Sequence, residues 1–184
     1  MQTLLTQDTD KPIDVFAPPA GLDLEDAVSY LNRLVRKPAF LAWVHPLLQQ
    51  ESEGWYVAHR WNSPDRSGSL QVFVWPPGTA TRIHDHASWG AYACALGTIF
   101  EERYERLDDG SLQDHARLKK SWERAWDEGE GASTVLPYDG GIHSIGNPGD
   151  ETAISVHLYG PRLSSIDGRD YDPSRDYVCD RLDD

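Results

Sequence analysis

From Gly54 onward the chain is a succession of short segments rich in Val, Ile, Tyr, Trp and Phe, and this pattern constrains the fold more than any other feature. Representative segments are WYVAHRW, SLQVFVWPPG, WGAYACALGTIFEERYERL, STVLPYDGG and TAISVHLYG. Gly, Pro, Asn and Asp separate them at short intervals, as is typical of a β-sandwich or a β-barrel. The sequence therefore predicts an all-β core.

The N-terminal part follows a different pattern. Residues 1–21 are polar and contain three prolines, which predicts an irregular lead-in. Asp23 is a candidate N-cap, and over residues 24–50 apolar side chains recur at the three- and four-residue spacing of an amphipathic helix. Because Pro38 and Pro46 interrupt that stretch, we expect two or three short helices there.

With 184 residues, a hydrophobic fraction of 39% and seven Trp, the chain has the size and apolar content of a single domain. We expect it to be organised in three segments. These are a lead-in and helical cap over residues 1–53, a β-barrel over residues 54–166, and a polar C-terminal tail over residues 167–184 packed on the barrel.

Charge and hydropathy exclude several kinds of partner. Acidic residues outnumber basic ones by 30 to 17, and the net charge of −13 repels phosphate backbones and anionic lipids, so we expect no nucleic-acid or membrane partner. The longest mostly apolar run, residues 90–100, is shorter than the roughly 20 residues that a membrane-spanning helix needs. No signal peptide is evident, and two cysteines fit a reducing compartment. We therefore expect a cytoplasmic protein, either a monomer or a small homo-oligomer.

His84 and His86 form the strongest local signal. If both lie on a strand, alternation places the two imidazoles on one face and Asp85 on the other. Two imidazoles on one face of a rigid strand make a good start to a metal site. The alternative is two histidines that have other partners or are exposed to solvent.

The spacing around this pair resembles that of the cupin superfamily. The first cupin motif contains Gly, five residues, His-x-His, three or four residues, Glu, and Gly six residues later; here Gly90 stands in the Glu position. The second motif runs from Gly through Pro to His and Asn, and here the stretch before the His is one residue longer. The matching residues are Gly78, His84, His86 and Gly97 in the first motif, and Gly131, Pro137, His143 and Asn147 in the second. The resemblance implies a jelly roll, also called a double-stranded β-helix barrel, with short N-terminal helices.

Since Gly90 replaces the usual carboxylate, the cupin resemblance implies three neutral imidazoles as metal ligands, from His84, His86 and His143. A dication held in this way keeps its full charge and leaves positions open for an anionic substrate and dioxygen. The alternative is a structural or adventitious zinc site, because three histidines also suit zinc.

A second constellation lies on the segment SVHLY. Period-two spacing places Ser155, His157 and Tyr159 on one face of a strand. If that face looks into the barrel, His157 can orient the Tyr159 hydroxyl while Ser155 orients the imidazole, which is how a general acid or base is supported. The alternative is a polar part of the core without a catalytic role.

Together these features resemble the cysteine dioxygenase family, the thiol dioxygenases of the cupin superfamily, over residues 56–161. The strings that carry the resemblance are IHDHASWG, YDGGIHSIGN and ISVHLYG. The HDHxxWG form is similar to bacterial members. Animal members place a cysteine near the Gly90 position and crosslink it to the tyrosine. No cysteine stands there, so we expect no thioether crosslink, and we interpret Cys94 as a core residue.

The resemblance implies an enzyme of sulfur amino acid metabolism. It would be a non-haem Fe(II) thiol dioxygenase that converts a small thiol carboxylate, cysteine or 3-mercaptopropionate, plus O2 to the sulfinate. The three histidines would hold Fe(II). Tyr159, supported by His157 and Ser155, would donate a hydrogen bond or a proton at the substrate or at oxygen.

The substrate carboxylate needs a partner, and three residues are candidates for the substrate-binding site. In the family, cysteine enzymes have an Arg on an early strand, whereas 3-mercaptopropionate enzymes have Gln. Alignment without gaps puts this position at Ala58, and a short gap would move it to Arg60. Arg82 shares parity with the two histidines and can point into the barrel, where a guanidinium could pair a carboxylate. Tyr56 is the third candidate. The alternative for each is a surface or core role.

Two other functions stay open at this point. One is a metal-binding cupin that acts on a non-thiol substrate, and the other is a non-catalytic cupin that binds a small ligand. The oriented phenol favours an enzyme, since a passive binder has little need of it.

Overall fold

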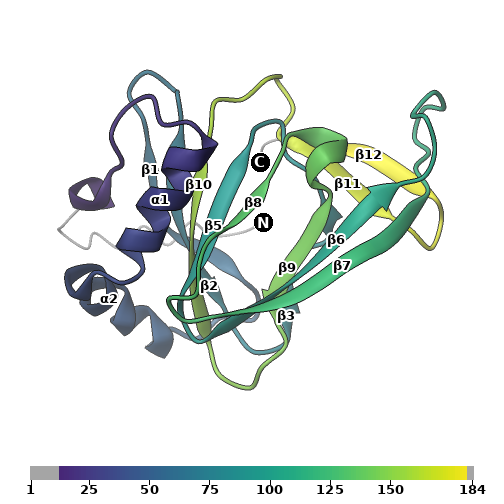
Figure 1. Cartoon of the computed structure of the whole chain (residues 1–184). Helices are drawn as coiled ribbons and strands as arrows, with labels where there is room; N and C mark the ends of the chain where they lie inside the picture. Colours follow the sequence, from purple (N-terminus) through teal and green to yellow (C-terminus); the bar gives the residue numbers. More distant parts are fainter. Residues whose placement is uncertain (1–12, 182–184) are drawn as a thin grey trace.

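A computed structural model of the protein describes residues 13–181 (Figure 1). Its first helices begin where the sequence predicts. Asp23 caps α1 (Leu24–Leu34), because its side chain accepts a hydrogen bond from the Asp26 N–H at 2.9 Å. Pro38 and Pro46 lie in the first turns of the next two helices, so the expected division into short helices is confirmed. These helices and the one before α1 are α2 (Pro38–Val44), η2 (His45–Gln49) and η1 (Ile13–Phe16). The part of the lead-in before Ile13 lies outside the described residues.

Two antiparallel sheets make up most of the remaining described chain, so the expected all-β core is confirmed. The five-stranded sheet has the order β1 (Tyr56–Asn62), β2 (Ser69–Trp75), β10 (Ala153–Tyr159), β5 (Gly90–Leu96) and β8 (Ser133–Val135). The seven-stranded sheet has the order β12 (Tyr177–Arg181), β11 (Gly168–Asp172), β4 (Ile83–His84), β9 (His143–Asn147), β6 (Thr98–Arg106) and β7 (Leu118–Asp127), with β3 (Thr79–Ala80) paired to β9. A short helix, η3 (Tyr138–Gly141), precedes β9.

Strand β10 shows how the core is divided, because both of its faces are covered. Ile154, Val156 and Leu158 pack with the N-terminal helices in one apolar cluster, and Figure 1 shows α1 and α2 against the outer face of the five-stranded sheet. The alternate residues of β10 face the second sheet, where Trp75 and Tyr92 belong to a second cluster. Side chains with odd numbers on β10 therefore reach the space between the sheets.

The C-terminal tail that we expect to pack on the barrel forms a hairpin within the seven-stranded sheet. β11 pairs with β12 on one side and with β4 on the other, so that Asp170 lies opposite His84. Residues 182–184 lie outside the described part. Over residues 13–181, no helix is long and apolar enough to cross a membrane.

Candidate metal centre

Three buried histidines converge between the two sheets. His84 ends β4 and pairs directly with His143, which begins β9, whereas His86 lies in the loop after β4. Their exposed fractions are 4%, 1% and 8% for His84, His143 and His86. The Nε2 atoms of His84 and His86 are 3.1 Å apart, and those of His86 and His143 are 3.2 Å apart. The structure thus brings together the three predicted ligands, although only His84 and His143 lie on strands.

The spacing of these nitrogens fits one divalent transition metal. If each nitrogen lies about 2.1 Å from a common ion, the separations of 3.1 and 3.2 Å correspond to N–metal–N angles of roughly 95–100°. These two angles are compatible with one ion bound by all three imidazoles, whose ligand atoms all lie within 4.8 Å of one another. An ion held by three protein ligands would have positions left for exogenous ligands.

A hydrogen bond holds His84 in the ligating form, and burial favours the neutral state of all three imidazoles. His84 Nδ1 lies 2.9 Å from the main-chain carbonyl of Arg82, which can only accept, so Nδ1 carries the proton and Nε2 does not. His143 Nδ1 lies 3.1 Å from the Tyr92 hydroxyl oxygen. Burial lowers the pKa of all three histidines, and it holds the pKa of His84 and His86 well below the ordinary value. Neutral imidazoles with a free Nε2 lone pair are the form that binds a metal.

Asp85, between two of the histidines, faces away from the cluster and fixes the loop that carries His86. Its buried carboxylate accepts hydrogen bonds from the Tyr171 hydroxyl at 2.7 Å and from Arg169 Nε and Nη2 at 2.8 and 2.6 Å. Arg169 Nη2 also donates to Asp139 on η3 at 2.7 Å. The loop is therefore tied both to β11 and to the segment before β9.

A row of polar side chains on β10, hereafter the β10 row, leads to the histidine cluster. Ser155 Oγ lies 2.7 Å from His157 Nε2, and His157 Nδ1 lies 3.1 Å from the Tyr159 hydroxyl oxygen. Trp75 Nε1 donates to Ser155 Oγ at 2.8 Å. The Tyr159 ring centroid is 5.0 Å from that of His86. The residues grouped by period-two spacing are thus hydrogen-bonded in sequence, and the row ends beside the cluster.

Both titratable groups of the β10 row are neutral. Burial lowers the pKa of His157 to about 3, and the nearby His143 acts in the same direction. Burial raises the pKa of Tyr159, and the positive charges of Arg181 and Arg60 oppose this rise only in part. Tyr159 therefore keeps its proton and can donate it.

Gly90 makes room for the Tyr159 ring. The two residues are paired across β5 and β10, and a Cβ on Gly90 would lie 3.2 Å from two ring carbons of Tyr159 and 2.9 Å from Val135. Cys94 is paired with Ser155 and is buried in the apolar cluster, where burial raises its thiol pKa to about 12. The cysteine that we interpret as a core residue thus lies in the core.

A β-bulge turns Arg60 toward the inner face of the five-stranded sheet. The register between β1 and β2 shifts at Ala58, which has no partner. Beyond the bulge Arg60 pairs with Gln71, and Gln71 pairs with His157. Directly paired residues share a face of the sheet, so Arg60 lies on the same face as the β10 row. Its exposed side chain donates from Nη2 to Gln71 Oε1 at 3.4 Å.

The other two substrate-side candidates point away from the cluster. The Arg82 side chain is 83% exposed and lies 3.8 Å from Asp170. The two-residue spacing from His84 predicts that Arg82 points into the barrel, but it does not. Strand β4 has only two residues, so the alternation of side chains does not extend to position 82. Tyr56 packs against the apolar cluster formed by the N-terminal helices and the five-stranded sheet, and its hydroxyl donates to Gln50 at 2.7 Å.

Two further groups reach the histidines without having been predicted. Arg181 Nη2 lies 3.4 Å from His86 Nδ1, and its Nε is buried with no hydrogen-bond partner within residues 13–181. A lone Arg in a polar tail carries no sequence signal. Tyr92 contacts His143, and strand alternation from Gly90 could have placed it on the inner face.

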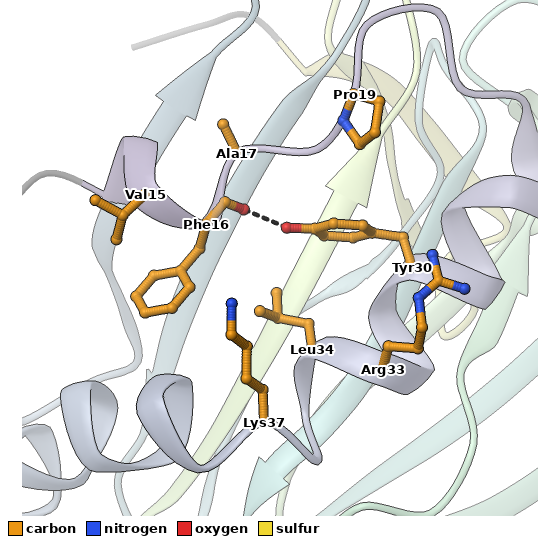
Figure 2. Close-up of a pocket in the computed structure, with 8 residues that line it drawn as sticks. All are labelled: Val15, Phe16, Ala17, Pro19, Tyr30, Arg33, Leu34 and Lys37. Atoms are coloured by element: carbon orange, nitrogen blue, oxygen red, sulfur yellow. Dashed lines mark hydrogen bonds between the residues drawn. The ribbon is translucent and has the colours of Figure 1, made fainter.

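A separate pocket of about 600 Å³ lies between η1 and α1 (Figure 2). Across it the Tyr30 hydroxyl donates to the Phe16 carbonyl, and Arg33 and Lys37 contribute two positive charges. The pocket contains none of the histidines. Convergent metal-ligating groups lie only between the sheets within residues 13–181, so the candidate site is placed there.

Comparison with known proteins decides the family. The model of the family described as cysteine dioxygenase type I matches residues 57–173, a range that contains the three histidines and the β10 row. The chain belongs to this family. Its membership, with two antiparallel sheets, shows that the chain has the cupin fold implied by the motif spacing. Cysteine dioxygenase family membership and the three-histidine cluster together indicate a metal-binding cupin of the dioxygenase type.

Solved structures similar to this cysteine dioxygenase family member are distant. The protein TT1209 from Thermus thermophilus is 17% identical, with 64% of this chain and 94% of that chain covered and a TM-score of 0.46. A cupin 2 conserved barrel domain protein from Salinispora arenicola is 17% identical, with 58% and 73% covered and a TM-score of 0.39. Oxalate oxidase in complex with the substrate analogue glycolate is 18% identical, with 61% and 53% covered and a TM-score of 0.46.

Proposed function

We propose that the protein is a mononuclear non-haem Fe(II) thiol dioxygenase. It converts a small thiol carboxylate, cysteine or 3-mercaptopropionate, and O2 to the sulfinate. The observation that carries the proposal is the β10 row, which presents the neutral Tyr159 phenol beside His86. In the overall reaction, RSH + O2 → RSO2H, both oxygen atoms become bonded to sulfur, and sulfur gives up the four electrons that dioxygen accepts.

Fe(II) held by His84, His86 and His143 would supply the redox chemistry that dioxygen needs, and its charge would favour the thiolate form of the substrate. The protein contributes the surroundings. The three histidines are buried between the sheets, which limits the access of water. Asp85 and its partners hold the loop of His86, so the ligands keep their arrangement without the substrate.

Donors and acceptors assign a direction to the β10 row. The Trp75 indole only donates, so Ser155 Oγ accepts from it and keeps its own proton for His157 Nε2. The His157 proton then lies on Nδ1 and is donated to the Tyr159 oxygen. The phenolic proton of Tyr159 is left free to hold the substrate sulfur or an oxygen atom during the reaction.

We infer that Arg60 or Arg181 binds the substrate carboxylate. Both lie close enough to Tyr159 for their charges to oppose the rise in its pKa. With a metal on His86 Nε2, Nδ1 would carry a proton and could not accept from Arg181, so the contact at 3.4 Å would become unfavourable. Arg181 would then offer to a carboxylate its Nη2 and its Nε, which has no hydrogen-bond partner in the described part of the chain. Asp167, 3.2 Å from Nη2, keeps the guanidinium near the site.

We expect Arg181→Gln to raise KM for 3-mercaptopropionate about 10- to 100-fold, since losing a hydrogen bond to a charged group costs about 1.5–3 kcal/mol. Cysteamine lacks the carboxylate, so its KM, or its inhibition constant if it is not turned over, should change little. Steady-state oxygen uptake measures these constants, and Arg82→Gln is the control because that side chain is exposed. An equal change in the constants for both thiols would contradict the proposal that Arg181 binds the carboxylate. The same assay on Arg60→Gln shows which arginine contributes more to KM for 3-mercaptopropionate.

Oxygen uptake by protein loaded with iron under anaerobic conditions tests the proposed function. Cysteine, 3-mercaptopropionate and cysteamine are compared side by side, and sulfinate is quantified. We expect one O2 consumed for each sulfinate formed and a preference for a thiol that bears a carboxylate. If iron is bound and no thiol in a wider panel is oxidised, the thiol reaction is rejected and a non-thiol substrate becomes the better hypothesis. Binding of a ligand without turnover of any substrate would indicate a non-catalytic cupin.

We also propose the partners and the location of the enzyme. Its partners are a small thiol and O2, and the excess of acidic residues disfavours binding of nucleic acid. Cys94 and Cys179 are free thiols, which suits a cytoplasmic location. We also propose the division into residues 1–53, 54–166 and 167–184, with the last segment supplying Arg181, and a monomer or small homo-oligomer.

A further inference from the structure

Behind His143 lies a buried pair of side chains that the proposed reaction does not use. Tyr92 and Glu101 are 1% and 0% exposed. The Tyr92 oxygen is 3.1 Å from His143 Nδ1, and the Tyr92 hydroxyl donates its proton to Glu101 Oε1. The direct separation between Glu101 Oε1 and His143 Nδ1 is longer, at 3.7 Å. Tyr92 therefore connects the candidate ligand to the carboxylate.

The Glu101 carboxylate is held by several donors. Its Oε1 accepts from Tyr92 and from Arg103 Nε, and its Oε2 accepts from Ser133 Oγ at 2.7 Å and from Trp126 Nε1 at 3.0 Å. Arg103 also forms an ion pair with it. An ionised carboxylate only accepts, so each of these groups must present a hydrogen to Glu101. The proton of Tyr92 is therefore committed to Glu101.

This commitment determines the tautomer of His143. With its proton donated to Glu101, the Tyr92 oxygen presents lone pairs to His143, so Nδ1 must carry the hydrogen. His143 Nε2 is then unprotonated and faces His86 Nε2. We propose that Tyr92 is a positioning residue which, with Glu101 behind it, holds His143 in the metal-ligating tautomer and ring orientation before the metal binds. The inference rests on the metal centre of the proposed function.

The three histidines are supported unequally. His84 is held in the same tautomer by the main-chain carbonyl of Arg82, which no substitution of a side chain removes. Among residues 13–181, His86 has beside Nδ1 only the guanidinium of Arg181, which is a donor. Support of His143 by a side chain is therefore the part of this arrangement that a single substitution can test. Loss of such an outer partner typically weakens metal binding about 10- to 100-fold.

Tyr92→Phe and Trp126→Phe form a matched pair of variants. Each removes one donor to Glu101 from a buried aromatic side chain, but only Tyr92 contacts His143. The metal-free wild type and both variants are titrated with Co(II) in competition with a chromophoric chelator. We expect Tyr92→Phe to raise the Kd for Co(II) about 10- to 100-fold over the wild type, and Trp126→Phe to stay close to the wild type.

A second measurement needs no variant of Tyr92 and so stands even if Tyr92→Phe does not fold. Nitrogen-15 NMR of the metal-free wild type, labelled at histidine and assigned with His143→Gln, should show the His143 proton on Nδ1. A proton on Nε2, or equal Co(II) affinities for Tyr92→Phe and Trp126→Phe, would overturn the inference. Tight binding of Co(II) by the wild type and both variants would support the metal centre and reject only the proposed role of Tyr92. A wild type that binds no Co(II) would reject the metal centre, and the inference with it.

Discussion

Replacing Tyr159 with Phe is expected to lower the turnover number about 100- to 10,000-fold, the range typical of a lost acid or base group. The substitution removes only the oxygen at the end of the β10 row. The ring still fits against Gly90 and His86, so iron content and KM for the thiol should change far less than turnover. Oxygen uptake at saturating thiol, with iron measured in the same sample, checks the expectation.

Ser155→Ala serves as a graded comparison for this prediction. It removes the far end of the β10 row and frees His157 to change tautomer, but it leaves the phenol in place. We expect a smaller loss of turnover than in Tyr159→Phe. If Tyr159→Phe kept nearly the turnover of the wild type, the β10 row would be only a polar part of the core.

Replacing His143 with Ala is expected to remove nearly all bound iron and to abolish oxygen uptake. Loss of an outer partner of a ligand costs about 10- to 100-fold in affinity, so loss of the ligand itself should cost more than about 100-fold. Metal content after gel filtration and chelator competition with Co(II) measure the effect. Chelation of the wild-type protein followed by readdition of Fe(II) should abolish and then restore uptake.

His45→Ala is the control for that experiment, because His45 is exposed and lies on η2, away from the cluster. Comparing the thermal unfolding of the metal-free proteins separates loss of a ligand from loss of the fold. If His143→Ala retained one tightly bound iron per chain, the metal would have to bind elsewhere than at the three histidines.

The β10 row could be predicted from the sequence because its geometry is local. Three residues two apart on one strand share a face whatever the rest of the chain does, so Ser155, His157 and Tyr159 were grouped correctly. Motif spacing likewise grouped His84 with His143, which pair directly in the second sheet. The family followed from the same residues and is shown by the match over residues 57–173.

The arginines show where local alternation fails. Even spacing from His84 and His86 favours an inward Arg82, but β4, which ends at His84, has only two residues, so alternation does not extend back to position 82. Parity alone would also have turned Arg60 outward, and the bulge at Ala58 reverses this. The bulge belongs to the pairing of β1 with β2, and the short length of β4 goes with its pairing to the distant strands β9 and β11. Strict alternation of neighbouring residues predicts neither feature, so it could not give the direction of either guanidinium.

Periodicity and motif spacing were thus sufficient for the all-β core, the grouping of the three histidines and the β10 row, because each depends on residues close in sequence or on a family pattern. The contact of Arg181 with His86 and the link from His143 through Tyr92 to Glu101 required the folded molecule. Arg181 and His86 come together because β12 and β4 both pair with β11, whereas Tyr92 and His143 face each other from two different sheets. The partners are 95 and 51 residues apart in the chain, so alternation along a single strand cannot predict either contact.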